Sequence, residues 1–492
     1  MKARAVRCLE SVRHMCPYLT KHGIKPELIA QNASKCPFMK ALNVSDSEAA
    51  DPSVLSEKLM DPLNFVDIDS FAPSHPLNDY FKAAIKRLHS EGRYRVFTNI
   101  LRHTGEFPKA TEFMTGTHSK VNVWCSNDYL GMGQHPLVLD AMHQSIDAHG
   151  AGSGGTRNIG GNTNLHVRLE KELATWHGKE SALVCTSGYV ANEAALSTLP
   201  DIFPQGCIYF SDKENHASMI CGMRHSKLNR KDIRVFKHND MKDLEAKLLK
   251  ASEDPEDMDK VKIIVFESVY SMSGSIAPME AIKKLSEEYS CLTYIDEVHA
   301  VGLYGKTGAG ICQERGIDMD IISGTLGKAV GVHGGYIAAN SLIADCIRSY
   351  ASSFIFTTSL PPANLAGSIA SIQYIKESSY ERKLLHKHSK YMKKRLKEEN
   401  LPVLPSESHI VPLFIGNPNV CKSVSDTLLK EHGIYVQPIN YPTVPRGEEL
   451  LRLSPGPLHT PKLIEEFIVA AKQVWKKFDL IDYKGLQLKL NH

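Results

Sequence analysis

Short apolar runs alternate with amphipathic stretches through the middle of the chain. The runs are too short for helices and stop at glycine, serine or acidic residues, as buried strands do. Strands are predicted at 121–125, 182–185, 208–210, 263–266, 292–295, 321–322 and 336–338. Apolar residues at helical spacing fill several gaps between them, for example at 244–249 and 282–289. A helix is also predicted earlier, at 80–89.

This alternation of strand and helix predicts an α/β fold with a mostly parallel sheet covered by helices. Beyond residue 362 the pattern changes to a long basic helix that ends near Lys397, followed by shorter alternating pieces. We therefore expect an N-terminal segment at 64–123, a large domain at 124–372 and a smaller C-terminal α+β domain at 373–492. In an α/β sheet of this kind, ligands bind beyond the carboxyl ends of the strands.

The first 26 residues carry six basic side chains against one acid, Glu10. That bias predicts a mitochondrial transit peptide, and the alternative is a solvated basic tail. The pairs Cys16-Pro17 and Cys36-Pro37 resemble haem-regulatory motifs, in which a cysteine thiolate binds free haem. The polar, acidic stretch that follows is typical of a linker, so residues 1–63 are interpreted as leader and linker.

Composition excludes several classes of protein. A net charge of +3, with no basic block interleaved with aromatic residues, argues against nucleic-acid binding. No apolar run approaches the roughly 18 residues of a membrane span. Eleven cysteines without metal-ligand spacing indicate reduced thiols rather than a disulfide framework.

Lys328 is the only formally charged residue between Asp320 and Asp345, in a chain with 23% charged residues. A stretch this poor in charge is predicted to be buried, and burial lowers the pKa of a lysine and frees its amine as a nucleophile or base. We interpret Lys328 as the lysine that holds pyridoxal phosphate (PLP) as a Schiff base. The alternative is an ordinary lysine on a glycine-rich turn.

Polar residues that suit the phosphate of PLP follow one predicted strand. Thr186-Ser187-Gly188-Tyr189 comes after the strand at 182–185 and leads into a helix that starts near Val190. Backbone N–H groups at that helix N-terminus, with the Ser187 hydroxyl, predict a phosphate cradle, to which Thr325 can donate. The alternative is an N-terminal serine cap alone.

Polar residues that suit the ring of PLP follow two other strands. Asp296, after the strand at 292–295, can pair with a protonated pyridine nitrogen, and His299 can reach the phenolic oxygen. His216, in the loop after 208–210, can stack on the ring. Taken singly, these residues are a turn aspartate, a capping histidine and a surface histidine. Together with Lys328 they predict one PLP site.

Motifs spread over residues 91–457 resemble those of the 5-aminolevulinate synthases, members of the α-oxoamine synthase family. They include Glu-Gly-Arg-Tyr-Arg, Cys-Ser-Asn-Asp-Tyr-Leu-Gly, Asn-His-Ala-Ser-Met, Asp-Glu-Val-His-Ala-Val-Gly and Ser-Gly-Thr-Leu-Gly-Lys. The resemblance implies a fold-type I PLP-dependent transferase with a seven-stranded sheet, and a homodimer with shared sites. It also implies condensation of glycine with succinyl-CoA at the start of haem synthesis in the mitochondrial matrix.

The resemblance also implies a role for each matching residue. The cofactor-binding residues it implies are Lys328, Asp296, Ser271, His299, His216, Ser187, Gly188, Tyr189, Thr325 and Tyr129, with Thr357 and Thr358 from the other subunit. The substrate-binding residues it implies are Arg452 for the glycine carboxylate and Arg95, Thr156, Asn158, Asn127, Ser211 and Thr443 for the acyl group. The segment 226–234 is about three residues longer than usual, so Lys231, Arg230 and Arg234 compete for contact with CoA.

Two rival functions remain open at this stage. The sister enzyme glycine C-acetyltransferase, or 2-amino-3-ketobutyrate CoA ligase, uses acetyl-CoA and has no acyl carboxylate to bind, so Arg95, Thr156 and Asn158 argue against it. A haem-sensing or inactive regulatory subunit would explain the Cys-Pro pairs. The joint presence of Lys328, Asp296 and His299 argues against a degenerate site.

Overall fold

The computed structural model describes residues 77–113 and 118–490. The predicted transit peptide, the linker and both Cys-Pro pairs lie outside the described residues. The chain divides into two compact units, Met1–Ala83 and Ala84–His492, and the description below concerns the second.

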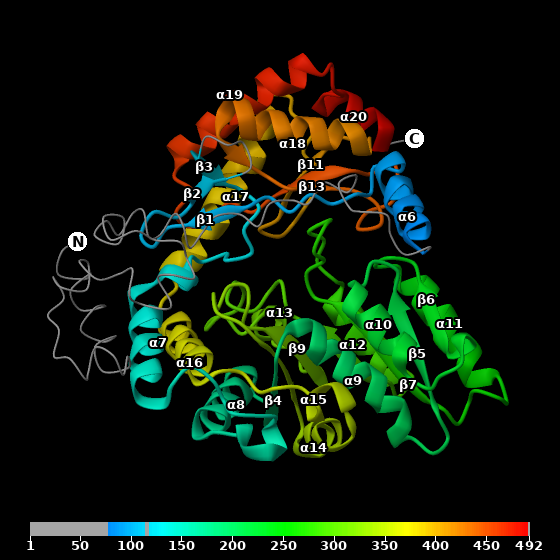
Figure 1. Ribbon diagram of the computed structural model, residues 1–492. Helices are drawn as coiled ribbons and strands as arrows, with labels where there is room; N and C mark the ends of the chain where they lie inside the picture. The colour runs from blue at the N-terminus through cyan, green and yellow to red at the C-terminus, as the bar shows by residue number, and fades with distance from the viewer. Residues whose placement is uncertain (1–76, 114–117, 491–492) are drawn as a thin grey trace, which may run out of the picture. The chain divides into compact units, whose positions relative to one another are not determined.

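Helices and strands alternate along most of the described chain (Figure 1). The helices are α6 (Asn78–Ser90), α7 (Pro136–His149), α8 (Asn164–His177), α9 (Gly188–Ile202), α10 (Ala217–His225), α11 (Met241–Glu253), α12 (Met279–Glu288), α13 (Ile311–Arg315), α14 (Ser341–Tyr350), α15 (Ser352–Ile355), α16 (Pro362–Glu377), α17 (Tyr380–Glu398), α18 (Pro418–His432), α19 (Pro461–Lys477) and α20 (Tyr483–Leu490). The strands are β1 (Ile100–Arg102), β2 (Lys109–Glu112), β3 (Ser119–Val123), β4 (Ser181–Cys185), β5 (Cys207–Asp212), β6 (Ile233–Phe236), β7 (Val261–Glu267), β8 (Leu292–Asp296), β9 (Ile321–Thr325), β10 (Gly335–Ala339), β11 (Val411–Phe414), β12 (Ile434–Tyr435), β13 (Pro438–Ile439) and β14 (Leu450–Leu453).

The central sheet has seven strands in the order β4-β10-β9-β8-β7-β5-β6. Only β10 runs antiparallel to its neighbours β4 and β9, which confirms the predicted mostly parallel sheet. Strand β6 was not predicted, because Ile233-Arg-Val-Phe236 mixes charged and apolar residues at the edge of the sheet. Strand β9 extends three residues past its predicted end, since Ser323, Gly324 and Thr325 are buried in the sheet although they are not apolar.

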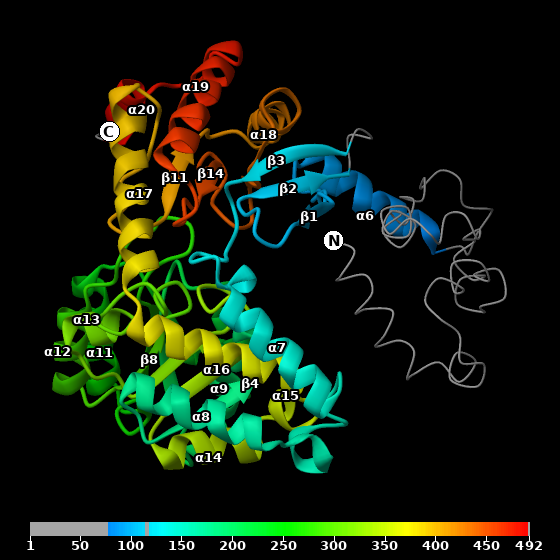
Figure 2. The ribbon, with the colours of Figure 1, turned by 90° about the vertical axis from the view of Figure 1, so that its left-hand side faces the viewer.

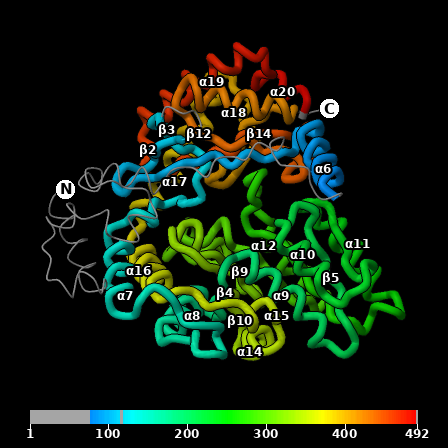
Figure 3. Tube along the Cα trace, in the orientation of Figure 1, coloured from blue at the N-terminus to red at the C-terminus, as the bar shows by residue number. Residues whose placement is uncertain are grey.

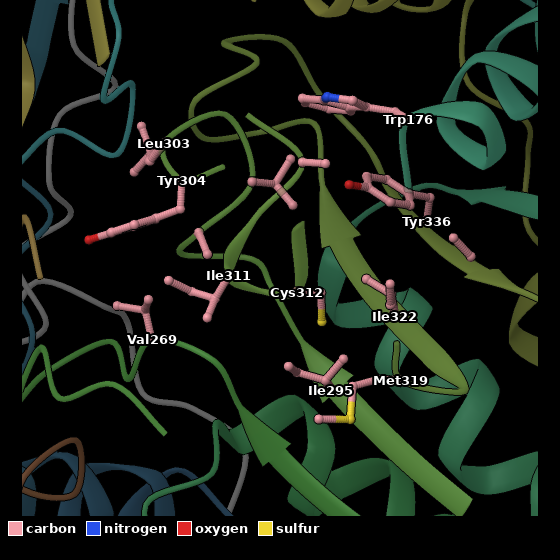
Figure 4. Close-up of a cluster of buried hydrophobic side chains, with 14 of the residues drawn as sticks. Trp176, Val269, Ile295, Leu303, Tyr304, Ile311, Cys312, Met319, Ile322 and Tyr336 are labelled. Carbon is pink, nitrogen blue, oxygen red and sulfur yellow. The ribbon is translucent and has the colours of Figure 1, made fainter. Parts of the chain in front are cut away.

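Successive residues of each central strand enter different apolar clusters, because side chains alternate between the two faces of a sheet. Ile295, Ile322 and Tyr336 belong to a cluster that includes residues of α8, α11, α12 and α16 (Figure 4). Tyr294 and Ile321 belong to a second cluster, with residues of α9, α10, α14 and α15. Burial on both faces fixes the register of the strands, and with it the positions of the residues at their ends.

Helices α7, α8 and α16 lie side by side (Figure 2), and α16 packs against the other two. The predicted boundary between residues 372 and 373 falls inside α16. The predicted division into a large and a small domain therefore stays a prediction.

The remaining strands form two small sheets, β1-β2-β3-β12 and β11-β14-β13. The predicted strand at 121–125 is β3, which pairs in parallel with the distant β12 and does not join the central sheet (Figure 3). A third apolar cluster joins Trp124 to residues of α17, α18 and α19. Within residues 77–113 and 118–490, no helix has both the length and the apolar character that a membrane span needs.

Candidate active site

The N-terminus of α9 lies at the carboxyl end of β4, as predicted for a phosphate cradle. The helix begins at Gly188, two residues earlier than expected, and Ser187 caps it by accepting a hydrogen bond from the Val190 N–H at 3.1 Å. The N–H groups of a first helical turn have no partner within the helix. Thr325 lies directly against this turn, since a Cβ atom added to Gly188 would stand 3.4 Å from the Thr325 Cβ.

Asp296 is the last residue of β8 and is buried, with 4% of its surface exposed. Its two carboxylate oxygens are held separately, Oδ2 by the Asn192 side-chain amide at 2.7 Å and Oδ1 by the Val298 N–H at 2.8 Å. Neither donor is charged, so the negative charge of Asp296 is not cancelled by these bonds. A carboxylate held in this way can pair with a cationic ring nitrogen.

Lys328 begins a chain of hydrogen bonds that ends at Arg452. The Lys328 amine lies 2.7 Å from His299 Nε2, and His299 Nδ1 lies 2.8 Å from the Tyr129 hydroxyl. Arg452 donates to that hydroxyl and to Asn127 Oδ1, the latter at 3.0 Å. The structure thus brings together five residues predicted from the sequence, which come from four separate segments of the chain.

Burial sets the charge of the amine and of its histidine partner. It lowers the pKa of Lys328 to about 7, and the nearby Asp296 carboxylate opposes that shift. Burial, then the charges of Lys328 and Arg452, hold the pKa of His299 well below its usual range. The Lys328 amine is therefore partly neutral near pH 7 and can act as nucleophile or base, while His299 stays neutral.

His216 and Ser271, predicted to contact the ring, lie on loops after two strands of the sheet, whereas Ser211, predicted for the substrate pocket, lies within β5. His216 follows β5, caps α10 and is exposed, and its Nδ1 lies 2.7 Å from the Ser218 hydroxyl. Ser271 is partly exposed in the turn after β7. Ser211 is buried in β5, where its hydroxyl accepts from the Asn215 amide at 2.9 Å.

A cavity of about 570 Å³ lies between residues 92–98 and the α18 region. Arg95 and Thr443 both line it, and the Arg95 guanidinium donates to the Thr443 hydroxyl at 3.2 Å. These two residues are therefore neighbours, as expected for one end of an acyl pocket.

The other residues expected to bind the acyl carboxylate form a separate group. Thr156 donates to Asn158 Oδ1 at 2.6 Å and pairs through the backbone with Thr358, which follows Thr357. Thr156 and Asn158 therefore lie beside Thr357 and Thr358, the threonines expected from the other subunit. They do not line the cavity that contains Arg95.

The three basic residues that compete for CoA differ in their surroundings. Lys231 is exposed and pairs with Glu256 at 2.9 Å. Arg234 lies in β6 and pairs with Asp257. Arg230 is exposed on the preceding 3-10 turn, and no ion pair joins it to another of the described residues.

Sequence reasoning missed three buried polar residues at the site. Asn192 lies on the buried face of α9, where most of the other residues are apolar. A single polar residue on that face could have indicated a role. Glu267 ends β7 beside Asp296, and burial and the Asp296 charge raise its pKa well above the usual range. The His409 and Tyr129 rings pack in a T-shaped arrangement, with centroids 4.6 Å apart, and nothing in the sequence around His409 indicates this contact.

These residues fit PLP. The site offers N–H donors for a phosphate, an oriented carboxylate for a ring nitrogen and a partly neutral amine for an aldehyde. Arg452 Nε is buried and has no hydrogen-bond partner among the described residues, so one donor at the site is left for a polar group of a ligand.

Residues 119–470 match the family model for aminotransferase class I and II. The chain is 52% identical over 400 residues to a 5-aminolevulinate synthase of Rhizobium meliloti (strain 1021), covering 81% of this chain and 97% of that one. The chain belongs to the 5-aminolevulinate synthase family. A mitochondrial member of the family from Yarrowia lipolytica is 46% identical over 417 residues, covering 82% of this chain and 72% of that one.

A solved structure of another enzyme resembles this member of the 5-aminolevulinate synthase family in fold. It is a serine palmitoyltransferase variant from S. paucimobilis with a bound PLP–myriocin aldimine, with a TM-score of 0.73 and 26% identity. The match covers 82% of this chain and 99% of that one. It confirms the predicted fold class, that of a PLP-dependent transferase.

Proposed function

We propose that this chain condenses glycine with succinyl-CoA, with PLP as cofactor, to give 5-aminolevulinate, CoA and carbon dioxide. One observation carries the proposal. The half-buried Lys328, whose amine has a pKa of about 7, is hydrogen-bonded to a neutral histidine, in a chain that belongs to the 5-aminolevulinate synthase family. The reaction is the first step of haem synthesis.

Lys328 attaches the cofactor and, once released by glycine, takes a proton from the glycine Cα as general base. PLP, when bound, would supply a sink for the electron pair that stays on this carbon when the proton is removed. Asp296 holds the proton on the ring nitrogen, and Ser187, Gly188, Tyr189 and Thr325 bind the phosphate. His216 covers the ring, and Ser271 and His299 bind its phenolic oxygen.

Arg452 binds the glycine carboxylate in this proposal. Its guanidinium is buried, one of its nitrogens lacks a partner among the described residues, and planar guanidinium groups favour carboxylates. Tyr129 and Asn127 orient it, since both accept hydrogen bonds from the same Arg452 nitrogen. The carboxylate held there is the one that leaves as carbon dioxide after the acyl group has been added.

Arg95 and Thr443 receive the succinyl carboxylate, with Ser211 nearer the ring. Thr156 and Asn158 complete that pocket from the partner copy, and Thr357 and Thr358 reach the phosphate in the same way. Support comes from the exposed apolar residues beside them, Ile159 and Phe356, whose exposed fractions are 72% and 80%. Such a patch is typical of an interface, so a homodimer with shared sites is part of the proposal.

Three further parts of the proposal rest on sequence and on similarity. The basic leader and the mitochondrial relative support targeting to the mitochondrial matrix. Cys16 and Cys36 are proposed to bind regulatory haem through their Cys-Pro pairs. Lys231 is proposed to contact CoA, with Arg230 and Arg234 as the alternatives.

A turnover assay with glycine and several acyl-CoA thioesters tests the function. We expect succinyl-CoA to be used far better than acetyl-CoA, and Arg95→Leu to lower kcat/KM for succinyl-CoA more than for acetyl-CoA. Preference for acetyl-CoA would favour glycine C-acetyltransferase. Absence of turnover by PLP-loaded protein with every thioester would favour a regulatory subunit.

A further inference from the structure

Asn192, on α9, is buried with 1% of its surface exposed. Its amide nitrogen donates to Asp296 Oδ2 at 2.7 Å and to the Ser218 hydroxyl at 2.9 Å. Its amide oxygen accepts from the Tyr294 hydroxyl at 2.7 Å. Both ends of the amide are thus satisfied, as a buried polar group requires.

The arrangement follows from the strand geometry. Tyr294 and Asp296 are two residues apart on β8, so both point to the face of the sheet that α9 covers. Tyr294 fixes the amide of Asn192 from one side, and the amide then fixes one oxygen of Asp296. The Val298 N–H holds the other oxygen, so that rotation of the carboxylate about its terminal bond is restricted from both sides.

The same amide reaches a second residue of the site. The Ser218 hydroxyl oxygen lies 2.7 Å from His216 Nδ1 and accepts a hydrogen bond from the Asn192 amide at 2.9 Å. His216 and Asp296 come from different strand ends, yet Asn192 and Ser218 join them through three hydrogen bonds. The residue that covers the ring and the residue that binds its nitrogen are therefore held relative to one another.

We propose that Asn192 is a positioning residue that orients the Asp296 carboxylate toward the pyridine nitrogen of PLP and couples it to His216. The proposal rests on the proposed function, because it takes Asp296 to be the partner of that nitrogen. The amide of Asn192 is occupied by Asp296, Ser218 and Tyr294, so its proposed role is indirect. Its effect on PLP binding therefore passes through Asp296, which makes a double-mutant cycle the appropriate test.

PLP dissociation constants are measured for the PLP-free full-length chain by titration with PLP alone. The four proteins are the wild type, Asn192→Ala, Asp296→Asn and the double variant. In the wild-type background, loss of a hydrogen bond to a charged group is expected to weaken PLP binding by about tenfold or more. In the Asp296→Asn background, Asn192→Ala is expected to change affinity less than about twofold, since the charge it orients is gone.

Asn215→Ala is the matched control. Asn215 is also a buried asparagine, 5% exposed, but its amide bonds Ser211 and the Val265 carbonyl and not Asp296. If Asn215→Ala weakens PLP binding, it is expected to do so by the same factor in the wild-type and Asp296→Asn backgrounds. If Asn192→Ala does not fold, the cycle is repeated with Tyr294→Phe, which removes one hydroxyl and is expected to weaken binding about threefold, again only when Asp296 is present.

Each outcome decides a different question. An equal factor for Asn192→Ala in both backgrounds, or no change in either, overturns the positioning role and leaves the proposed function intact. If Asp296→Asn alone leaves PLP affinity unchanged, the assignment of Asp296 in the proposed function fails. If Asn192→Ala weakens PLP binding only when the Asp296 carboxylate is present, the result supports both the positioning role of Asn192 and the proposed role of Asp296.

Discussion

The low pKa of Lys328 predicts that the lysine destabilises the PLP-free fold at low pH. Its pKa is about 7 in the folded chain against the ordinary value of 10.5, a difference of about 5 kcal/mol between the two charge states. The folded state binds fewer protons than the unfolded state between these pH values, so this group makes the fold more stable as pH rises through that window. The penalty is complete below pH 7 and absent above pH 10.5.

Replacement of Lys328 by methionine removes this penalty. At pH 9 the fold loses about 2 kcal/mol, because the amine must give up its proton to be buried, and at pH 6 it loses about 5 kcal/mol, because the amine is buried with its charge. Lys328→Met is therefore expected to gain about 3 kcal/mol more, relative to wild type, at pH 6 than at pH 9. Denaturant unfolding of the PLP-free full-length proteins at both pH values measures the difference.

An exposed lysine of α12 provides the control for this experiment. Lys284→Met is expected to change stability by the same amount at pH 6 and pH 9, since its amine is in water. If Lys328→Met also shifts stability equally at both pH values, the amine is not desolvated. The Lys328 amine would then not be partly neutral near pH 7.

Three other variants test separate parts of the site. Tyr129→Phe removes the hydroxyl between His299 and Arg452, and steady-state kinetics should show the KM for glycine raised by about tenfold; an unchanged KM contradicts the proposed carboxylate site. Ser187→Ala should lower the free energy of unfolding by about 1 kcal/mol and weaken PLP binding; unaltered PLP affinity argues against the cradle. Gly324→Ala places a Cβ 2.2 Å from the buried Tyr336 ring and should cost about 1–3 kcal/mol in a denaturation curve, whereas a silent substitution contradicts this packing.

The sequence was sufficient to predict where some of the candidate site residues lie. Asp296, Thr325 and Ser187 follow or end buried apolar runs, and a parallel sheet brings such ends to one edge. Lys328 was identified by the absence of other charges around it. Together these residues predict one PLP site, and the family motifs imply a role for each of them.

Residues whose role depends on long-range packing could not be predicted in this way. Asn192 is one polar residue on a helix, and its function depends on Asp296, which lies on a strand far along the chain. Glu267 ends a strand as Asp296 does, but only the register between β7 and β8 puts the two carboxyls side by side. The edge strand β6 lacks an apolar run because only part of it is buried.

Lys328 is the amine proposed to bond PLP, and every other proposed role at the site follows from that bond. The direct measurement is borohydride reduction of the PLP-loaded full-length protein, followed by proteolysis and mass spectrometry of the labelled peptide. We predict a single phosphopyridoxyl group, attached to Lys328, with loss of the visible absorption band. A label on any other lysine, or PLP that washes away after reduction, would contradict the account.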